Sequence, residues 1–198
     1  MHQLFTTQVY QNKIAFDLKD LQQEIIHLSK VDQQGIAWSK KNYVNGYTSY
    51  GSLDQLHHMA STFTMLESKI KKHVDQFLKS LEYAVAKKSL KMNSCWVNIM
   101  PAGSQHTSHL HPHSVISGTY YVSIPPRSSC IKFEDPRLGL FMNAPLVKET
   151  ARTENKRYFV IDPKPGELIL FESWLKHEVP RNVSKKPRIS VSFNYGWN

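Results

Sequence analysis

Two stretches in the first half of the chain carry apolar residues at helical spacing. The first begins directly after Asp17, and its apolar positions are Leu18, Leu21, Ile25 and Leu28. Residues three or four apart share one face of a helix, and an aspartate before the first turn is a favourable N-cap. The second stretch, 61–86, has its apolar positions at Phe63, Leu66, Ile70, Val74, Phe77 and Leu81. We expect two amphipathic helices that cover one face of a sheet.

From residue 94 onward the pattern changes to short runs rich in β-branched and aromatic residues. These runs are 95–100, 115–124, 130–133, 157–161, 167–171 and 188–194. Turn residues separate them and no helical pattern lies between them, which favours a jelly roll over a parallel sheet. The predicted fold is mainly β with N-terminal helices, in a single domain of 198 residues. Its double-stranded β-helix (jelly-roll) core spans 93–198, and the helical part, 1–92, flanks one face of that core.

Two segments are predicted to be loops. Residues 46–51 contain two tyrosines between two glycines, and we interpret this segment as a surface loop rather than an active-site lid. Residues 135–156 form the longest segment without periodicity. A long loop in a compact domain is often functional or mobile.

The composition is typical of a globular protein, with 40% hydrophobic and 21% charged residues. No apolar run approaches the roughly 18 residues of a membrane helix, and the amino terminus shows no secretory signal. We therefore expect a cytoplasmic protein that does not enter a membrane. Cys95 and Cys130 lack the spacing of a zinc or redox motif and are expected to be reduced thiols.

The formal net charge of +9 raises the question of a polyanionic partner. The basic residues occur as scattered pairs such as Lys40-Lys41 and Lys185-Lys186, not as one stripe interleaved with aromatics. This favours a solvated basic surface and argues against nucleic acid. An anionic substrate stays open, and so does a homodimer.

Four of the ten histidines lie within eight residues: His106, His109, His111 and His113. His109 and His111 are two apart in a predicted strand, where alternate side chains share a face, so their imidazoles can converge on a metal ion. His177 follows the apolar strand 167–171 and can close the site after several intervening strands. The pattern indicates a metal site at the mouth of a barrel.

A cupin is one class with such a site, and the spacing from Gly103 to His109-Leu-His111 matches the opening of its first motif. The glutamate expected three or four residues after the second histidine is missing, because Val115 and Ile116 stand there. The second motif also lacks its histidine after Gly166. A cupin-like metalloprotein, or a metal-binding module without catalysis, is therefore the alternative interpretation.

Eleven residues after His177 comes Arg188-Ile-Ser190, whose arginine and serine point to the same side of a predicted strand. An arginine that points inward among apolar neighbours is unfavourable without an anion. A guanidinium binds a carboxylate through two hydrogen bonds, and a hydroxyl adds a further donor. This pair resembles the arginine and serine with which 2-oxoglutarate-dependent iron(II) oxygenases hold the distal carboxylate of 2-oxoglutarate.

The resemblance covers nearly the whole chain, in the order that one branch of this superfamily shows. The matching segments are 4–10, Trp96-Val-Asn98, His109-Leu-His-Pro112, 117–122 and 165–177. It implies an Fe(II)- and 2-oxoglutarate-dependent dioxygenase that consumes O2, releases succinate and CO2, and hydroxylates a C–H bond. The substrate is not identified; a small molecule and a protein side chain both stay open.

The resemblance also implies roles for single residues. The implied metal ligands are His109, His111 and His177; the implied 2-oxoglutarate contacts are Arg188, Ser190 and Tyr121; the candidates for substrate contact are Trp96, Asn98, His106 and His113. One departure is His111, which stands where iron(II) oxygenases usually have a carboxylate ligand. The ligand pairs His111 with His113, or His106 with His109, remain alternatives.

Overall fold

The computed structural model describes residues 1–86 and 89–197. Its helices are α1 (Leu18–Val31), α2 (Gln33–Asn42), α3 (Leu56–Met59) and α4 (Ser61–Ser80). Asp17 caps α1 as predicted, since its side chain accepts hydrogen bonds from the backbone N–H groups of Lys19 and Asp20. The prediction of a helix over 61–86 is wrong at its end: α4 stops at Ser80, and Glu82 has a positive φ of 56° that no α-helix accommodates.

The strands form two antiparallel sheets. The six-stranded sheet has the order β1 (Val9–Lys13), β8 (Glu167–Glu172), β5 (Ile116–Ser123), β10 (Arg188–Trp197), β3 (Leu90–Met100) and β2 (Tyr47–Thr48). The four-stranded sheet has the order β4 (His106–His109), β9 (His177–Val179), β6 (Ile131–Glu134) and β7 (Tyr158–Ile161). All six predicted strands are present, and the predicted mainly β architecture is confirmed. Strands β1, β2 and β9 were not predicted.

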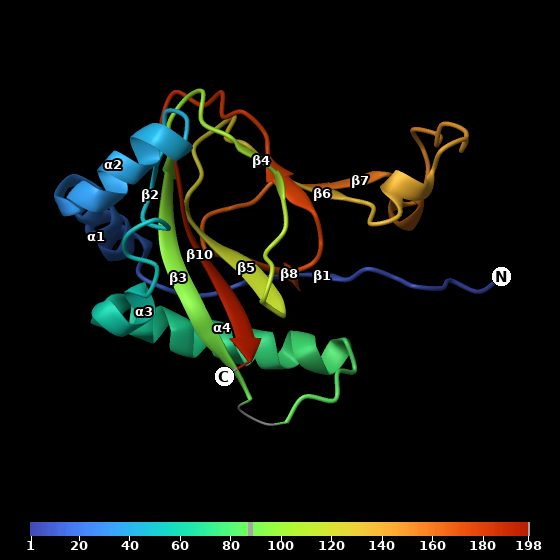
Figure 1. Cartoon of the computed structure of the whole chain (residues 1–198), viewed down its shortest axis with the longest axis horizontal. Helices are drawn as coiled ribbons and strands as arrows, with labels where there is room; N and C mark the ends of the chain where they lie inside the picture. Colours follow the sequence, from blue (N-terminus) through green and yellow to red (C-terminus); the bar gives the residue numbers. More distant parts are fainter. Residues whose placement is uncertain (87–88, 198) are drawn as a thin grey trace.

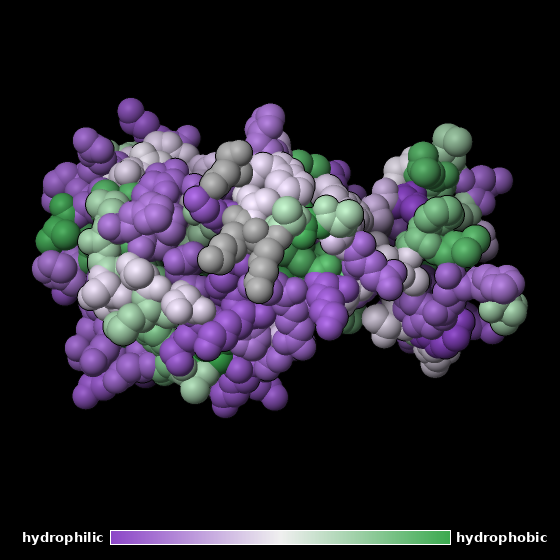
Figure 2. Space-filling view, turned by 90° about the horizontal axis from the view of Figure 1, so that it is seen from below, coloured by the Kyte–Doolittle hydropathy of each residue, from purple (hydrophilic) through white to green (hydrophobic). Residues whose placement is uncertain are grey.

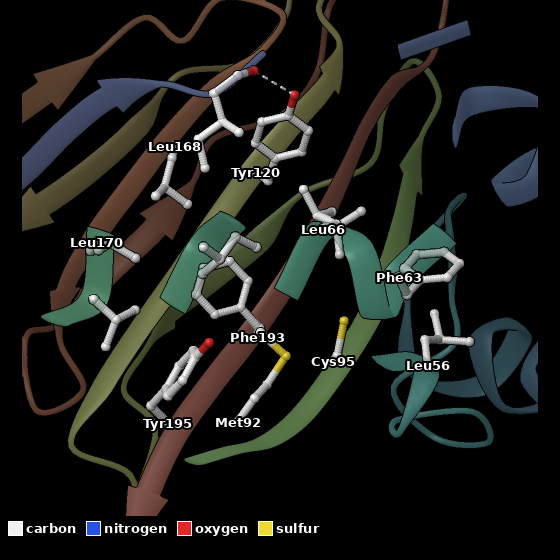
Figure 3. Packing of buried hydrophobic residues seen from close by; sticks show 14 of the residues in the cluster. Leu56, Phe63, Leu66, Met92, Cys95, Tyr120, Leu168, Leu170, Phe193 and Tyr195 are labelled. Atoms are coloured by element: carbon white, nitrogen blue, oxygen red, sulfur yellow. Dashed lines mark hydrogen bonds between the residues drawn. The ribbon is translucent and has the colours of Figure 1, made fainter. Parts of the chain in front are cut away.

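The helices cover the outer face of the six-stranded sheet (Figure 1). Leu21 and Ile25 of α1 and the apolar stripe of α4 belong to the same buried cluster as Val191 and Phe193 of β10. In Figure 3, side chains of α4 such as Leu66 lie over the strands of this sheet. The apolar face of the sheet, produced by alternation along its strands, and the apolar stripe of α4 therefore pack together as one buried layer.

The segment that was predicted to be a surface loop, 46–51, is partly a strand. Tyr47 and Thr48 form β2, which pairs with Ile99 and Asn98 at the edge of the large sheet. Tyr47, Thr48 and Ser49 are buried. The interpretation as a surface loop is wrong for these three residues, because pairing with β3 supplies hydrogen bonds that the local sequence does not reveal.

Residues 135–157 connect β6 to β7 and project away from the two sheets (Figure 1). The segment contains two single 3-10 turns, Leu138–Leu140 and Thr153–Asn155. Figure 2 shows it as a separate lobe with apolar patches, and its exposed apolar side chains include Leu140, Met142 and Leu146. The sequence prediction of a long irregular segment at 135–156 is confirmed.

In the part of the chain that the structure describes, no helix has the length and apolar character needed to cross a membrane.

Candidate metal centre

A cavity of about 340 Å³ lies between the two sheets. Side chains of β3, β5 and β10 line it from the large sheet, and those of β4 and β9 line it from the small sheet. This volume is at the lower end of the range for small-molecule pockets. The cavity can hold a small ligand together with a limited part of a second one.

Three histidines converge on one side of the cavity. Each of His109, His111 and His177 offers a ring nitrogen, and these atoms all lie within 4.8 Å of one another. The Nε2 atoms of His111 and His177 are 3.4 Å apart. Ring nitrogens at this spacing surround a position that a divalent cation can occupy, with open sides for further ligands.

The backbone holds two of these rings by their other nitrogen. Nδ1 of His109 is 2.6 Å from the carbonyl oxygen of Thr107, and Nδ1 of His177 is 2.9 Å from that of Leu175. A carbonyl oxygen can only accept, so each Nδ1 carries the proton and each Nε2 keeps a free lone pair. Metal-ligating histidines in proteins are commonly oriented in this way.

Burial in the cavity also keeps two of the histidines, His111 and His177, neutral. Burial, followed by the neighbouring His109, lowers the pKa of His177 to about 3 and that of His111 to about 4. A neutral imidazole has the lone pair that a metal ion needs. These rings are therefore ready to act as ligands at neutral pH.

The predicted backbone at the histidine pair is wrong. Strand β4 ends at His109, so His111 does not share a regular strand with it. Instead the backbone N–H of His111 donates to the carbonyl oxygen of Ser173, at 2.9 Å, and this contact turns the His111 ring toward the others. The expected convergence is present, but a contact between distant segments produces it.

Arg188 lies at another part of the same cavity and is 2% exposed. Within the described chain its only hydrogen bond runs from Nη1 to the sulfur of Met100, at 3.2 Å, and its Nε has no partner. Its guanidinium carbon lies 4.9 Å from the centre of the Tyr121 ring, and the Tyr121 hydroxyl is also buried without a partner. A buried cation beside unpartnered donors is the arrangement that an anion would complete.

Tyr121 remains a donor under ordinary conditions. Burial raises the pKa of the Tyr121 hydroxyl to about 12, and the positive charge of Arg188 only partly opposes this effect. Ser190, 1% exposed, lies directly across from Tyr121 in the pairing of β10 with β5, and both line the cavity. Three potential donors to a carboxylate thus come from two adjacent strands.

The structure brings three of the four candidate substrate residues to the cavity: Trp96, Asn98 and His106. The ring of His106 stacks on Tyr43 at 4.5 Å, and burial followed by the charge of Arg188 lowers its pKa to about 3. His113 does not line the cavity, because the chain turns there with a φ of 67° and leaves its side chain exposed. The group of converging histidines contains one member of each alternative ligand pair, His111 and His109, but neither His113 nor His106.

One wall of the cavity was largely missed by sequence reasoning, which singled out only the two-tyrosine segment 46–51 from it. It is formed by the end of α2 and the β2 segment, through Trp38, Asn42, Tyr43, Thr48 and Tyr50. These residues precede the histidines by more than fifty positions, and no local pattern links the two regions. The two-tyrosine segment 46–51 was the available signal.

Residues 94–194 match the model of a protein family described as "Putative 2OG-Fe(II) oxygenase". The match covers half of the chain, including the three histidines and Arg188. The chain belongs to this family. This oxygenase accordingly depends on Fe(II), 2-oxoglutarate and O2, as the resemblance implied, and the cupin-like alternative is not supported. The search of curated proteins returned no match.

Solved structures of similar fold include one that holds 2-oxoglutarate. The oxygenase is similar to a prolyl-4-hydroxylase from Pseudomonas putida, with a TM-score of 0.63, 14% identity, and 96% of this chain and 94% of that chain covered. EctD from S. alaskensis gives a TM-score of 0.65 at 14% identity over 96% and 73% of the two chains. HygX from Streptomyces hygroscopicus, with nickel, 2-oxoglutarate and hygromycin B bound, gives a TM-score of 0.61 at 16% identity, with 98% of this chain and 84% of that chain covered. These likenesses confirm the double-stranded β-helix fold.

Proposed function

We propose that this oxygenase binds Fe(II) through His109, His111 and His177 and hydroxylates a C–H bond of its substrate. The observation that carries the proposal is the convergence of three histidine ring nitrogens within 4.8 Å, in the same cavity as an arginine that has no carboxylate partner among the described residues. Bound iron would supply oxidative decarboxylation of 2-oxoglutarate, with one atom of O2 entering succinate and the other the substrate.

The same proposal assigns the distal carboxylate of 2-oxoglutarate to Arg188, with Ser190 and Tyr121 as further donors. Three histidines contribute no negative charge, so the carboxylate at the keto-acid end of 2-oxoglutarate would offset one charge of Fe(II), and the distal carboxylate would offset the charge of Arg188. Arg188 then holds the far end of the molecule and fixes its direction in the cavity. His106 and Tyr43 border this end. Because its pKa is lowered, the His106 ring is neutral and adds no positive charge there.

The test is metal content and 2-oxoglutarate binding of the purified protein. We expect about one Fe(II) per chain after anaerobic loading, 2-oxoglutarate binding that requires the metal, and succinate formation in air without added substrate. His177→Ala should remove all three properties. His27→Ala, a change of an exposed histidine on α1, is the matched control and should remove none. Unchanged iron content in His177→Ala, or metal binding without affinity for 2-oxoglutarate, would refute the proposal.

The substrate in this proposal is a small molecule or a protein side chain. The net charge of +9 would draw anionic molecules to the protein surface, which supports a substrate that carries negative charge outside the cavity. The thiols of Cys95 and Cys130 are unpaired, and such thiols are typical of a reducing compartment such as the cytoplasm.

We also propose a homodimer that forms through β7. This strand lies at the edge of the four-stranded sheet, and its side chains Tyr158, Phe159 and Val160 are all at least 38% exposed. Exposed apolar edge strands readily pair with another chain. If two copies pair antiparallel about Phe159, Tyr158 faces Val160 and Lys156 faces Asp162, each twice. Together with Lys156 and Asp162, which flank it on either side, the strand is thus complementary to itself in shape and charge.

Sedimentation velocity tests the dimer. Lys156→Glu should weaken it, because this change places like charges opposite each other, and the double exchange Lys156→Glu with Asp162→Lys should restore it. Lys148→Glu, the same charge change at a position that does not flank β7, is the control. A monomeric wild-type protein, or equal weakening by both lysine variants, would exclude this interface.

A further inference from the structure

The pairing of β10 with its neighbours orders the cavity residues along the large sheet. Arg188 lies opposite Met100, Ser190 opposite Asn98, and Ser192 opposite Trp96. The cavity therefore has a cationic end at Arg188 and an aromatic end at Trp96, about four residues apart along the strand. The Trp96 ring lies 6.1 Å from the ring of His111, so the aromatic end adjoins the proposed metal position.

The aromatic end contains no charged side chain. Among the described residues that line the cavity, Arg188 is the only charged one, and aspartate, glutamate and lysine do not occur. If 2-oxoglutarate occupies the Arg188 end, nothing in the remaining wall can neutralise a charge on the substrate. Burying an unpaired charge there would be strongly unfavourable.

Three aromatic rings form the wall at this end. Tyr50 lies edge-on to Trp96, with ring centres 5.1 Å apart, and edge-on to Trp38 at 6.1 Å. Tyr50 is 50% exposed and Trp96 is 7% exposed, so the wall leads from the surface inward. Rings arranged in this way offer faces and edges on which another planar ring packs favourably.

The wall is held in place before any ligand arrives. Ser49, the neighbour of Tyr50, donates its backbone N–H to the carbonyl oxygen of Val97 at 3.1 Å. The Ser49 hydroxyl in turn accepts from the N–H of Val97 at 3.2 Å. Gly51 lies so close to Trp38 that a Cβ there would approach the indole to 2.4 Å. Tyr50 therefore belongs to a preorganised wall, which lowers the entropy lost on binding.

Asn98 adds a polar contact between the two ends. Its Nδ2 donates to the Ser192 hydroxyl at 3.1 Å, and this leaves Oδ1 as a buried acceptor without a partner in the described chain. Asn98 is 4% exposed and lines the cavity. A buried carbonyl oxygen of this kind favours a ligand that brings an N–H or O–H donor.

We propose that the part of the substrate that enters the cavity is an uncharged planar ring with an N–H or O–H donor. Tyr50 and Trp96 hold the ring, and Asn98 accepts a hydrogen bond from its donor. The inference rests on the proposed function in one respect, namely that 2-oxoglutarate occupies the Arg188 end. An anionic group of the substrate would remain outside the cavity.

The test is the binding of three series of probes to protein loaded anaerobically with Fe(II) and 2-oxoglutarate. The parent probes are phenol, 2-pyridone and uracil. Each is compared with a methylated form that lacks every N–H and O–H donor (anisole, N-methyl-2-pyridone and 1,3-dimethyluracil) and with its carboxylated form. Ligand-observed NMR titration gives the affinities. In at least one series the parent should bind about tenfold tighter than the carboxylated form and about threefold tighter than the methylated form. Binding of no parent ring, or tighter binding of carboxylated forms in every series, would overturn the proposal.

Variants at the exposed end of the wall test the location. Tyr50→Ala should weaken binding of the parent ring about three- to tenfold, whereas Tyr50→Phe keeps the ring and should retain the affinity. Asn98→Ala should abolish the preference for the parent over the methylated form. Trp197→Phe changes a tryptophan that is 61% exposed and does not line the cavity, so it should have no effect. Unaltered affinity in Tyr50→Ala would overturn the proposed wall.

The two proposals fail separately. Succinate formation by the wild-type protein without any probe tests the use of 2-oxoglutarate and involves no ring. Ring binding without succinate formation would refute the proposed function and leave the aromatic wall supported. Succinate formation without ring binding would refute the substrate class alone.

Discussion

The two faces of β10 differ in the residues they carry: one is apolar and the other is polar. On the outer face its alternate residues are Ile189, Val191, Phe193 and Tyr195, all at most 1% exposed and all in the apolar cluster beneath the helices. On the inner face the intervening residues are Arg188, Ser190, Ser192 and Asn194, which line the cavity. One strand therefore contributes to the core with one face and to the cavity with the other.

The difference shows how stability and function are separated in this fold. The outer face is stabilised by burial of apolar surface, which needs no ligand. The inner face of β10 and the neighbouring strand β5 keep buried polar atoms that have no partner in the described chain, such as Arg188 Nε and Tyr121 Oη, and a bound anion would satisfy them. Substitutions on adjacent residues of β10 should therefore affect different measurements.

Arg188→Met should produce the largest effect on the inner face. Removing one partner of a buried charge pair costs about 2–5 kcal/mol, so we expect the affinity for 2-oxoglutarate to fall at least about 30-fold. The stability of the ligand-free protein should not fall, because an apolar side chain of similar length replaces an unpartnered charge. Isothermal titration and urea unfolding measure the two quantities. A loss of stability with unchanged affinity would contradict the division between the faces.

Ile189→Ala, at the next residue, should give the opposite result. Ile189 is 1% exposed and packs in the outer cluster, so truncation should lower the free energy of unfolding by about 2–5 kcal/mol. The remaining folded protein should bind 2-oxoglutarate with wild-type affinity. The same two measurements apply, and a reduced affinity in the folded fraction would show that the faces are coupled.

Ser190→Ala should have a smaller effect in the same direction as Arg188→Met. One hydrogen bond to a charged group contributes about 1.5–3 kcal/mol, so the affinity for 2-oxoglutarate should fall at least about tenfold. Urea unfolding without ligand should be little changed. Ser192→Ala, two residues further along the same face, is the comparison variant. If Ser192→Ala weakened 2-oxoglutarate binding more than Ser190→Ala, the order of residues along the cavity would need revision.

The smallest effect is expected from replacing His57, which should alter how the free energy of unfolding depends on pH. His57 belongs to α3, is 2% exposed, and has its pKa lowered mainly by burial. The unfolded chain then binds a proton more readily, so this residue reduces stability as the pH falls below the ordinary histidine pKa of about 6.5. His57→Asn should lose less stability than wild type between pH about 7.5 and about 5.5, as measured by urea unfolding. Equal losses would assign the pH dependence to the cavity histidines.

Several elements could be predicted because their signals are local. The stripe of α4, the cap at Asp17 and the alternation of β10 each lie within a short window of sequence, and each is present. Helix α2 was not predicted, because Ile36 and Trp38 are its only large apolar residues and no stripe results. Its cap, Asp32, is buried and also binds the Tyr47 hydroxyl, so tertiary contacts help to define where the helix begins.

The sequence predicted which candidate metal ligands converge, but it did not predict the backbone that brings them together. The spacing of His109, His111 and His177, followed by Arg188 and Ser190, pointed to residues that do meet in one cavity. The position of His111 depends on a hydrogen bond to Ser173, sixty-two residues away in the chain. Such a contact leaves no trace in the local pattern, because either residue could have other partners.

By itself, the sequence determined which residues are chemically suited to act and which face of each strand they occupy. Periodicity and residue type are local properties, and they place Arg188 and Ser190 on the face opposite Ile189. Only the tertiary structure decided that Tyr43, Tyr50 and Trp38 form the remaining wall of the cavity. Their approach depends on the pairing of β2 with β3, and strand pairing between distant segments is selected by the packing of the whole molecule.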